Sequence, residues 1–143
     1  MVLPHAKPYR ESVDSYWAVN VQLEPNCIVQ PMSTDEVSTA VQTLANSITG
    51  DSCKFAVRSG GHATWSGANN IEDGVTIDLS NLNSTIYHKG AKTATLHPGA
   101  RWGDVYKSLE PFGVTVPGGR TAPVGVGGFL LGGTIVESQF LSE

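Results

Sequence analysis

The feature that most constrains this chain is a pair of short apolar runs separated by an amphipathic segment. Residues 26–31 (NCIVQP) predict a short buried strand, and residues 53–58 (CKFAVR) predict a second one. Residues 32–48 predict a helix, because Ser33 and Glu36 form a capping box at its start. One face of this helix carries Val37, Ala40, Val41, Leu44 and Ala45. A strand–helix–strand unit of this kind is most simply parallel.

The second half of the chain predicts a different arrangement. Residues 74–80 (GVTIDLS) predict a third strand, and residues 84–99 predict two strands around a Lys-Gly turn, which is an antiparallel hairpin. Residues 101–113 predict a short amphipathic helix, and residues 114–119 (VTVPGG) predict one more strand. The buried side of the helix is expected to carry Trp102, Val105, Tyr106 and Leu109. A parallel unit followed by an antiparallel portion predicts an α+β fold.

Composition narrows the class of protein. The 143 residues suffice for one ordinary domain or for the front part of a larger one, and 40% hydrophobic with 15% charged residues argues against disorder. A net charge of −4 without a basic run makes nucleic acid an unexpected partner, and no apolar stretch approaches a membrane span. The N-terminus lacks the apolar core of a signal peptide, so the chain as written is expected in the cytoplasm. Secretion is the alternative if the N-terminus is incomplete.

The two cysteines leave two readings open. Cys27 and Cys53 each begin an apolar run, and their spacing is not that of a metal site, so we expect no metal. The two runs look like adjacent parallel strands of one sheet, so a disulfide is geometrically possible, and we predict that the two sulfurs lie close enough to bridge. Two buried thiols are the other reading, and composition favours it.

Two glycine-rich stretches are the candidate ligand-binding segments. The first glycine segment, residues 59–62 (SGGH), directly follows a predicted strand, and the second glycine segment is residues 118–133. Glycine lets the backbone approach a ligand closely, and successive N–H groups in such turns bind anions. We therefore expect a large ligand with phosphates at the first segment and a flat, mostly apolar body along the second.

Two common nucleotide motifs are absent. The run GVGGFLLGG resembles the dinucleotide fingerprint, but Leu130 stands where its third glycine would be, and the run does not lie between a first strand and its helix. No glycine run continues as Gly-Lys-Ser or Gly-Lys-Thr, so the phosphate-binding loop of nucleoside triphosphatases is missing as well.

In combination, the motifs CIVQP, CKFAVRSGGHATWSGANN, GVTIDLSNLN and LHPGARWGDVYKSLEPFGVTVPGGRTAPVGVGGFLLGG resemble the N-terminal part of FAD-linked oxidoreductases. The family is that of vanillyl-alcohol oxidase and para-cresol methylhydroxylase (PCMH), in its berberine-bridge-enzyme-like branch. The resemblance extends over residues 16–133. It implies a PCMH-type FAD-binding domain that is incomplete, with an N-terminal βαβ subdomain and the start of the second, antiparallel subdomain.

The resemblance also assigns residues to the cofactor. It implies that the first glycine segment wraps the FAD pyrophosphate and that a ring nitrogen of His62 is bonded to a methyl group of the flavin. Some relatives carry a second cysteine tether, but its position is Thr121 here, so one covalent link is expected. The implied cofactor-binding residues are Arg58, Ser59, Gly60, Gly61, His62, Ser66, Gly67, Gly118, Gly119, Thr121, Gly125, Val126, Gly127, Gly128, Gly132 and Gly133.

Other residues near these motifs have more modest expected roles. Arg120 either contacts phosphate or is a surface charge, and Trp65 is expected to pack within its loop. Trp102 and Asp104 are expected to pack and cap the start of a helix. The sequon at Asn83 is expected to be unmodified in the chain as written.

The expected organisation is an N-terminal extension at 1–22, a partial FAD-binding domain at 23–133 and a divergent tail at 134–143. The resemblance implies an FAD-dependent oxidoreductase that acts on an alcohol, sugar or amine-type carbon, with a small-molecule substrate and dioxygen as its partners. The substrate pocket and the catalytic base lie outside the matched region. A non-catalytic fragment with weak or no FAD binding is the alternative, because an incomplete sheet leaves open edges and apolar faces.

Overall fold

Three parallel strands form the sheet of the N-terminal lobe, residues 1–82. The computed structural model describes residues 1–46 and 53–133. Strands β1 (Cys27–Val29), β2 (Phe55–Arg58) and β3 (Val75–Asp78) lie in the order β1-β3-β2, and Thr76 of the central strand is opposite Ile28 and Ala56. The three predicted strands are confirmed, and both outer strands run parallel to β3.

The predicted adjacency of the two cysteine-bearing strands is wrong, because β3 lies between β1 and β2. Next-nearest strands in a sheet are about 9.5 Å apart, whereas the Cα atoms of a disulfide lie within roughly 7 Å. Cys27 is half-buried, Cys53 is exposed, and both are free thiols. The structure therefore offers no bridge here, and only one of the two thiols is shielded from solvent.

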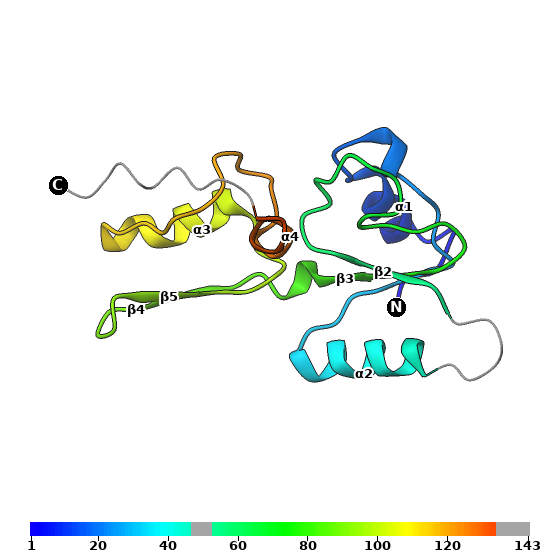
Figure 1. Ribbon diagram of the computed structural model, residues 1–143, viewed down its shortest axis with the longest axis horizontal. Coiled ribbons are helices and arrows are strands. Elements are labelled where there is room, and N and C mark those ends of the chain that lie inside the picture. Colours follow the sequence, from blue (N-terminus) through cyan, green and yellow to red (C-terminus); the bar gives the residue numbers. More distant parts are fainter. Residues whose placement is uncertain (47–52, 134–143) are drawn as a thin grey trace.

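Helix α2 (Thr34–Ala45) lies along one face of this sheet and α1 (Lys7–Asp14) lies on the other (Figure 1). The predicted capping box starts α2: the Ser33 hydroxyl oxygen accepts the Glu36 N–H at 3.2 Å, and the Glu36 carboxylate accepts the Met32 N–H at 2.8 Å. On the predicted apolar face, Val37, Ala40, Val41 and Leu44 are half-buried and Ala45 is exposed.

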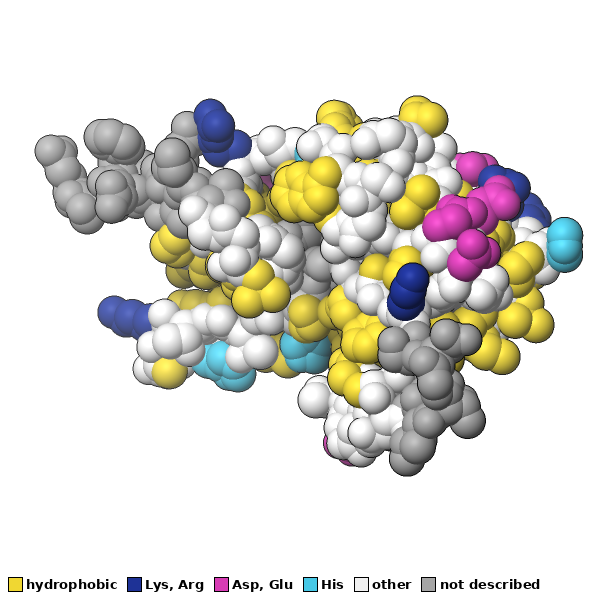
Figure 2. Space-filling model, turned by 45° about the vertical axis from the view of Figure 1, so that its right-hand side comes forward, with side chains coloured by type: hydrophobic (Ala, Val, Ile, Leu, Met, Phe, Trp, Pro, Cys, Tyr) yellow, Lys and Arg dark blue, Asp and Glu magenta, His cyan; other side chains and the backbone are white. Residues whose placement is uncertain are grey.

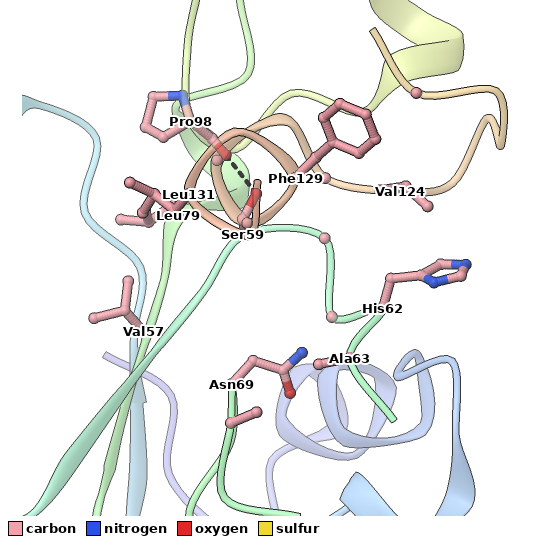
Figure 3. Close-up of a pocket in the computed structure, with 18 of the residues that line it drawn as sticks. Val57, Ser59, His62, Ala63, Asn69, Leu79, Pro98, Val124, Phe129 and Leu131 are labelled. Carbon is pink, nitrogen blue, oxygen red and sulfur yellow. Dashed lines mark hydrogen bonds between the residues drawn. The ribbon is translucent and has the colours of Figure 1, made fainter. Parts of the chain in front are cut away.

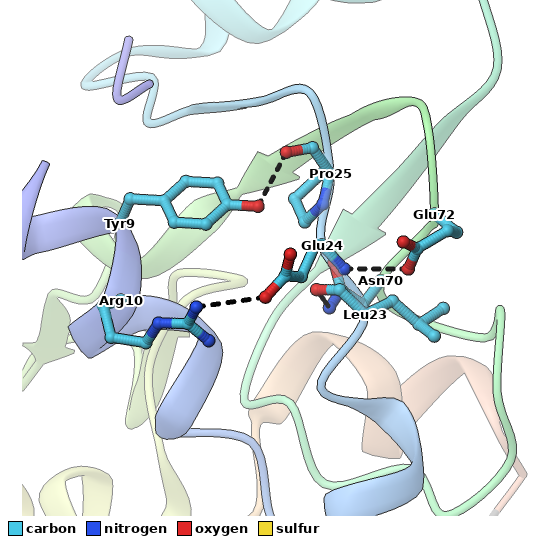
Figure 4. A network of polar contacts seen from close by, with 7 residues as sticks. All are labelled: Tyr9, Arg10, Leu23, Glu24, Pro25, Asn70 and Glu72. Carbon is cyan, nitrogen blue, oxygen red and sulfur yellow. Dashed lines mark hydrogen bonds and ion pairs between the residues drawn. The ribbon is translucent and has the colours of Figure 1, made fainter. Parts of the chain in front are cut away.

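Helix α1 was not predicted, although Tyr9 and Val13 are spaced as one face of a helix and pack against Ile28. Polar contacts tie this helix to the chain around β1 (Figure 4). The Tyr9 hydroxyl donates to the Pro25 carbonyl at 2.7 Å, and Arg10 pairs with Glu24 at 3.0 Å. The segment expected to be an extension thus contributes buried side chains to the lobe.

The C-terminal lobe, residues 83–133, consists of a hairpin covered by a helix. Strands β4 (Thr85–His88) and β5 (Thr93–Leu96) are antiparallel, as predicted. Helix α3 (Trp102–Leu109) packs its apolar side on the hairpin, and α4 (Val126–Leu131) lies where the lobes meet (Figure 1). The core of this lobe comprises Ala100, Trp102, Val105, Leu109 and Val126. Turns of 3₁₀ helix are formed by Val19–Val21, Leu79–Asn81 and Glu110–Phe112.

Three expectations for this lobe need correction. Residues 114–119 form no strand; Val114 and Val116 pack on the core instead, and Pro117 lacks the N–H that a strand ladder needs. The second glycine segment contains α4, which the glycines obscured. Asp104 lies in the first turn of α3 but does not cap it. Trp102 packs at the helix start as predicted, with 0% of its surface exposed.

Across residues 1–46 and 53–133, the helices are all too short or too polar to cross a membrane.

Candidate functional site

A cavity of about 790 Å³ lies where the two lobes meet, and both glycine segments line it. Its volume is within the range of natural cofactor sites, about 300–1,000 Å³. Val57, Leu79 and Leu131 gather on one side of it, and His62 and Val124 lie on the other (Figure 3). The predicted residues that line the cavity are Ser59, Gly60, Gly61, His62, Gly119, Thr121, Gly125, Gly127, Gly128 and Gly132.

The two glycine segments are in direct backbone contact inside this site. A Cβ atom added to Gly60 would overlap the backbone nitrogen of Gly125, and one added to Gly125 would lie 2.7 Å from the Gly60 Cα. The Ser59 hydroxyl donates to the Pro98 carbonyl at 2.5 Å, which fixes the lobes at the same point (Figure 3). Both positions therefore require glycine because of their neighbours, and the lobes meet through main chain.

The first glycine segment presents backbone N–H groups that have no acceptor. Within the described residues, the amides of Gly60, Gly61 and His62 donate no hydrogen bond. Gly61 has a φ of +68°, the left-handed conformation that occurs in anion-binding turns. A main-chain N–H group that is shielded from solvent without an acceptor raises the free energy of the folded protein, unless a ligand or water accepts a hydrogen bond from it. This turn is therefore suited to a phosphate or pyrophosphate.

His62 lies at the cavity wall with its imidazole stacked on Trp17. The ring centroids are 4.4 Å apart and the planes differ by 16°. Its Nε2 is buried and has no hydrogen-bond partner among the described residues. The predicted anchor is thus brought to the same cavity as the phosphate-binding turn.

Asn69 is a lining residue that the sequence analysis missed. Its side-chain Oδ1 is buried without a partner in the described part of the chain, whereas its backbone carbonyl accepts from the Tyr16 hydroxyl at 3.1 Å. An acceptor in this state can take a hydrogen bond from a ligand. The signal was present in the sequence as a pair of polar amides, Asn69 and Asn70, directly after a glycine turn.

The side chain of Arg58 lies away from the cavity, although it was expected to bind the cofactor. It is only 3% exposed, and its guanidinium donates to the Ser12 carbonyl at 2.9 Å and to the Ser15 hydroxyl at 2.7 Å. It also stacks over the Tyr16 ring at 3.9 Å. Strand alternation explains the difference, because Arg58 and the lining residue Val57 point to opposite faces of the sheet. Arg58 fastens the segment after α1 to the sheet.

Five other predicted positions do not line the cavity. Gly118 lies against the Trp102 ring, and Val126 is buried in the core of its lobe. Ser66, Gly67 and Gly133 are exposed, and the two glycines have φ values of +84° and +63°. These positions shape the segments rather than face the ligand. Arg120 and Trp65 do line the cavity. Trp65 was expected to pack within its loop, but 67% of its surface is exposed.

Apolar residues complete the wall, and most of them come from outside the two glycine segments. They are Val57, Ala63, Ala68, Leu79, Pro98, Val124, Phe129 and Leu131. No local pattern distinguishes them from core residues. They form a surface suited to a flat apolar group next to the anion-binding turn.

Residues 25–141 match the family model described as an FAD binding domain. This chain belongs to that family. The match continues into residues 134–141, which were expected to diverge. The FAD-dependent monooxygenase sdcF of Emericella nidulans is 54% identical over 133 residues, which are 93% of this chain and 27% of that protein.

Solved structures of related FAD-binding domains have the same fold. Aclacinomycin oxidoreductase is 30% identical with a TM-score of 0.76, over 93% of this chain and 26% of that one. Berberine-bridge-enzyme-like 1 of Physcomitrella patens is 25% identical with a TM-score of 0.74, over 89% and 27%. The predicted family and α+β fold are confirmed. The chain spans about a quarter of the length of these proteins.

The residues present fit the cofactor of this family. The unpaired amides of the first glycine segment match a pyrophosphate, and the orphaned Asn69 Oδ1 and His62 Nε2 are polar atoms that a bound group can approach. Gly60 and Gly125 both line the cavity, and their close contact contributes only backbone atoms to its wall. FAD has both the charge and the flat apolar ring that this lining accommodates.

Tyr16 packs beside the site: its ring lies beneath the Arg58 guanidinium, and its hydroxyl donates a hydrogen bond to the Asn69 carbonyl. The titration of its phenol tests how well this tyrosine is buried. Burial raises its pKa from 10.0 to about 12, although the nearby Arg58 opposes the shift. Folding therefore favours the neutral phenol, and this stabilisation is complete below pH 10 and is lost as the pH rises towards 12. The difference in phenolate absorbance between the wild type and Tyr16→Phe should have its midpoint near pH 12. A midpoint near pH 10 would show that the phenol is solvated.

Proposed function

We propose that this chain is the FAD-binding segment of an FAD-dependent oxidoreductase in which FAD is covalently attached through His62. The observation that carries the proposal is the convergence of the two glycine segments on one cavity, with His62 at its wall. Each segment alone is weak evidence, because glycine turns serve many purposes. Together they supply the anion-binding turn, the apolar surface and the imidazole that one dinucleotide requires.

Named residues would hold each part of the cofactor. The amides of Gly60, Gly61 and His62 would donate to the pyrophosphate, whose negative charge suits a nest of unpaired N–H groups. The Asn69 Oδ1 would accept a hydrogen bond from the cofactor. Phe129 and Val124, which line the cavity, would contact apolar parts of it. The backbone contact of Gly60 with Gly125 holds the two glycine segments together around this cavity.

His62 is the one nucleophile in the cavity that we assign to attachment. Thr121 also lines the cavity, but its hydroxyl is a poor nucleophile at neutral pH without an activating base. A single covalent link through the histidine follows. A neutral imidazole has a ring nitrogen whose lone pair can act as a nucleophile.

Bound FAD would supply two-electron redox chemistry, and the protein would position and shield the ring. Sequence relatives are named as monooxygenases, and structural neighbours are named as oxidases or oxidoreductases. We propose dioxygen as the electron acceptor and an alcohol, sugar or amine-type carbon as the electron donor. The groups that bind and deprotonate this donor belong to the three quarters of the relatives' length that the chain does not match.

Exposed apolar side chains favour a second reading for the 143-residue chain on its own. Met32 is 75% exposed and Leu131 is 91% exposed, and apolar side chains are spread over the face in Figure 2. Apolar surface of this kind is typical of an interface with further protein. The isolated chain would then be a non-catalytic fragment that binds FAD weakly.

Flavin content tests both readings. The full-length protein that carries this segment should purify with one FAD per polypeptide and show flavin absorption in the visible region. The 143-residue chain, purified in parallel, should bind less FAD if its exposed apolar surface normally contacts the remainder of the fold. A full-length protein that neither contains FAD nor takes it up would contradict the proposed function.

A further inference from the structure

Trp17 makes an aromatic contact that the packing of the N-terminal lobe does not explain. It follows Tyr16 in the segment after α1, and 62% of its surface is exposed. The core around it is formed by other side chains, including Tyr9, Val13 and Tyr16. Its ring contact is with His62, at 4.4 Å between centroids and 16° between planes. An indole that is mostly exposed contributes little to a core, so its role lies in this contact.

The main chain around Trp17 is fastened to both sides of His62. The Trp17 N–H donates to the Gly61 carbonyl at 3.0 Å, and the Asn20 side chain donates to the Thr64 carbonyl at 2.8 Å. Just before it, Tyr16 is held between Arg58 and the Asn69 carbonyl. The indole is therefore presented to the imidazole by backbone that has little freedom to move.

The imidazole has no polar contact that would fix its orientation. Nε2 is buried without a partner, and within the described residues no hydrogen bond is made by either ring nitrogen of His62. Rotation of a histidine ring about its Cβ–Cγ bond is soft when nothing restrains it. The stack on Trp17 thus supplies the restraint that a hydrogen bond supplies elsewhere.

We propose that Trp17 is a positioning residue that holds the His62 imidazole in the orientation needed for its attachment to FAD. The proposal rests on the proposed function. In attachment, a C–N bond forms between the ring nitrogen and a methyl carbon of the flavin, and the N–H and one methyl C–H bond break. The two electrons enter the flavin ring system, and dioxygen then takes up these electrons and two protons to give hydrogen peroxide. Trp17 touches none of the reacting atoms and acts through His62.

The test measures the rate of attachment in the full-length protein, prepared without flavin and then mixed with FAD. Flavin fluorescence that remains on the polypeptide after denaturation reports attachment. An aromatic stack is worth about 0.5–1.5 kcal/mol, so Trp17→Ala should slow attachment by up to about tenfold. Trp17→Phe, which retains a flat ring, should restore most of the rate. Val19→Ala changes an exposed neighbour that lies outside the stack and should behave as wild type.

Reversible FAD affinity and the unfolding temperature separate positioning from folding. Both should be nearly unchanged in Trp17→Ala, because the indole is mostly exposed and does not line the cavity. Trp17→Ala with the wild-type attachment rate would overturn the inference and leave the proposed function standing. An attachment rate that falls only together with affinity and unfolding temperature would also overturn it. Wild-type protein that loses all of its flavin on denaturation would contradict both the role of Trp17 and the proposed covalent attachment through His62.

Discussion

The Gly125→Ala variant is expected to bind FAD about a hundredfold more weakly than its parent, since overpacking costs up to about 3 kcal/mol. The added Cβ would overlap the Gly60 backbone nitrogen and the Ser59 hydroxyl, and it would lie 2.7 Å from the Gly60 Cα. Backbone atoms cannot rotate away as a flexible side chain can. The two glycine segments would therefore move apart, and the cavity between the lobes would lose its shape.

The affinity is best measured by titrating FAD into full-length protein in a His62→Ala background, where attachment through that residue is impossible. Gly90→Ala is the matched control, because Gly90 lies in the β4–β5 turn, a Cβ there meets nothing within 4 Å, and its φ is compatible with alanine. The control should bind FAD as its parent does. Equal affinities for Gly125→Ala and Gly90→Ala would show that the glycine contact does not shape the site.

Strands β1 to β5 and helices α2 and α3 could be predicted because their signals are local. Alternating or continuous apolar runs marked β1, β2, β3 and the hairpin, and the Ser33 capping box fixed the start of α2. The order β1-β3-β2 could not be predicted in the same way, because pairing of parallel strands depends on contacts between distant segments. The disulfide hypothesis for Cys27 and Cys53 failed for that reason.

The same distinction between local sequence signals and contacts of distant segments applies to the candidate site. Most of the predicted glycines do line the cavity, and they could be assigned to it because two separate glycine runs are unusual and the family motif connects them. The sequence does not predict the roles of Trp17, Asn69 and Phe129, because tertiary packing brings each of them to the cavity or to His62. Arg58 illustrates the limit most clearly: it directly precedes the first glycine segment, yet strand alternation turns its side chain towards α1.

His62→Ala is expected to remove all covalently bound flavin. The imidazole lines the cavity beside the phosphate-binding turn, and the alanine variant has no nitrogen at that position. Reversible FAD binding should persist, because the backbone amides that would hold the pyrophosphate remain. Thr121→Ala is the matched control within the same cavity, and it should retain the full covalent flavin content because its hydroxyl carries no link.

The most direct measurement is peptide mapping by mass spectrometry of the wild-type full-length protein after denaturation and proteolysis. The peptide that contains His62 should be heavier by one FAD less two hydrogens, and fragmentation should place the added mass on the histidine. The same peptide should be unmodified in His62→Ala protein apart from the substitution. Flavin mass on any other peptide, or FAD recovered entirely in free form from the wild type, would contradict the assignment of His62 as the anchor.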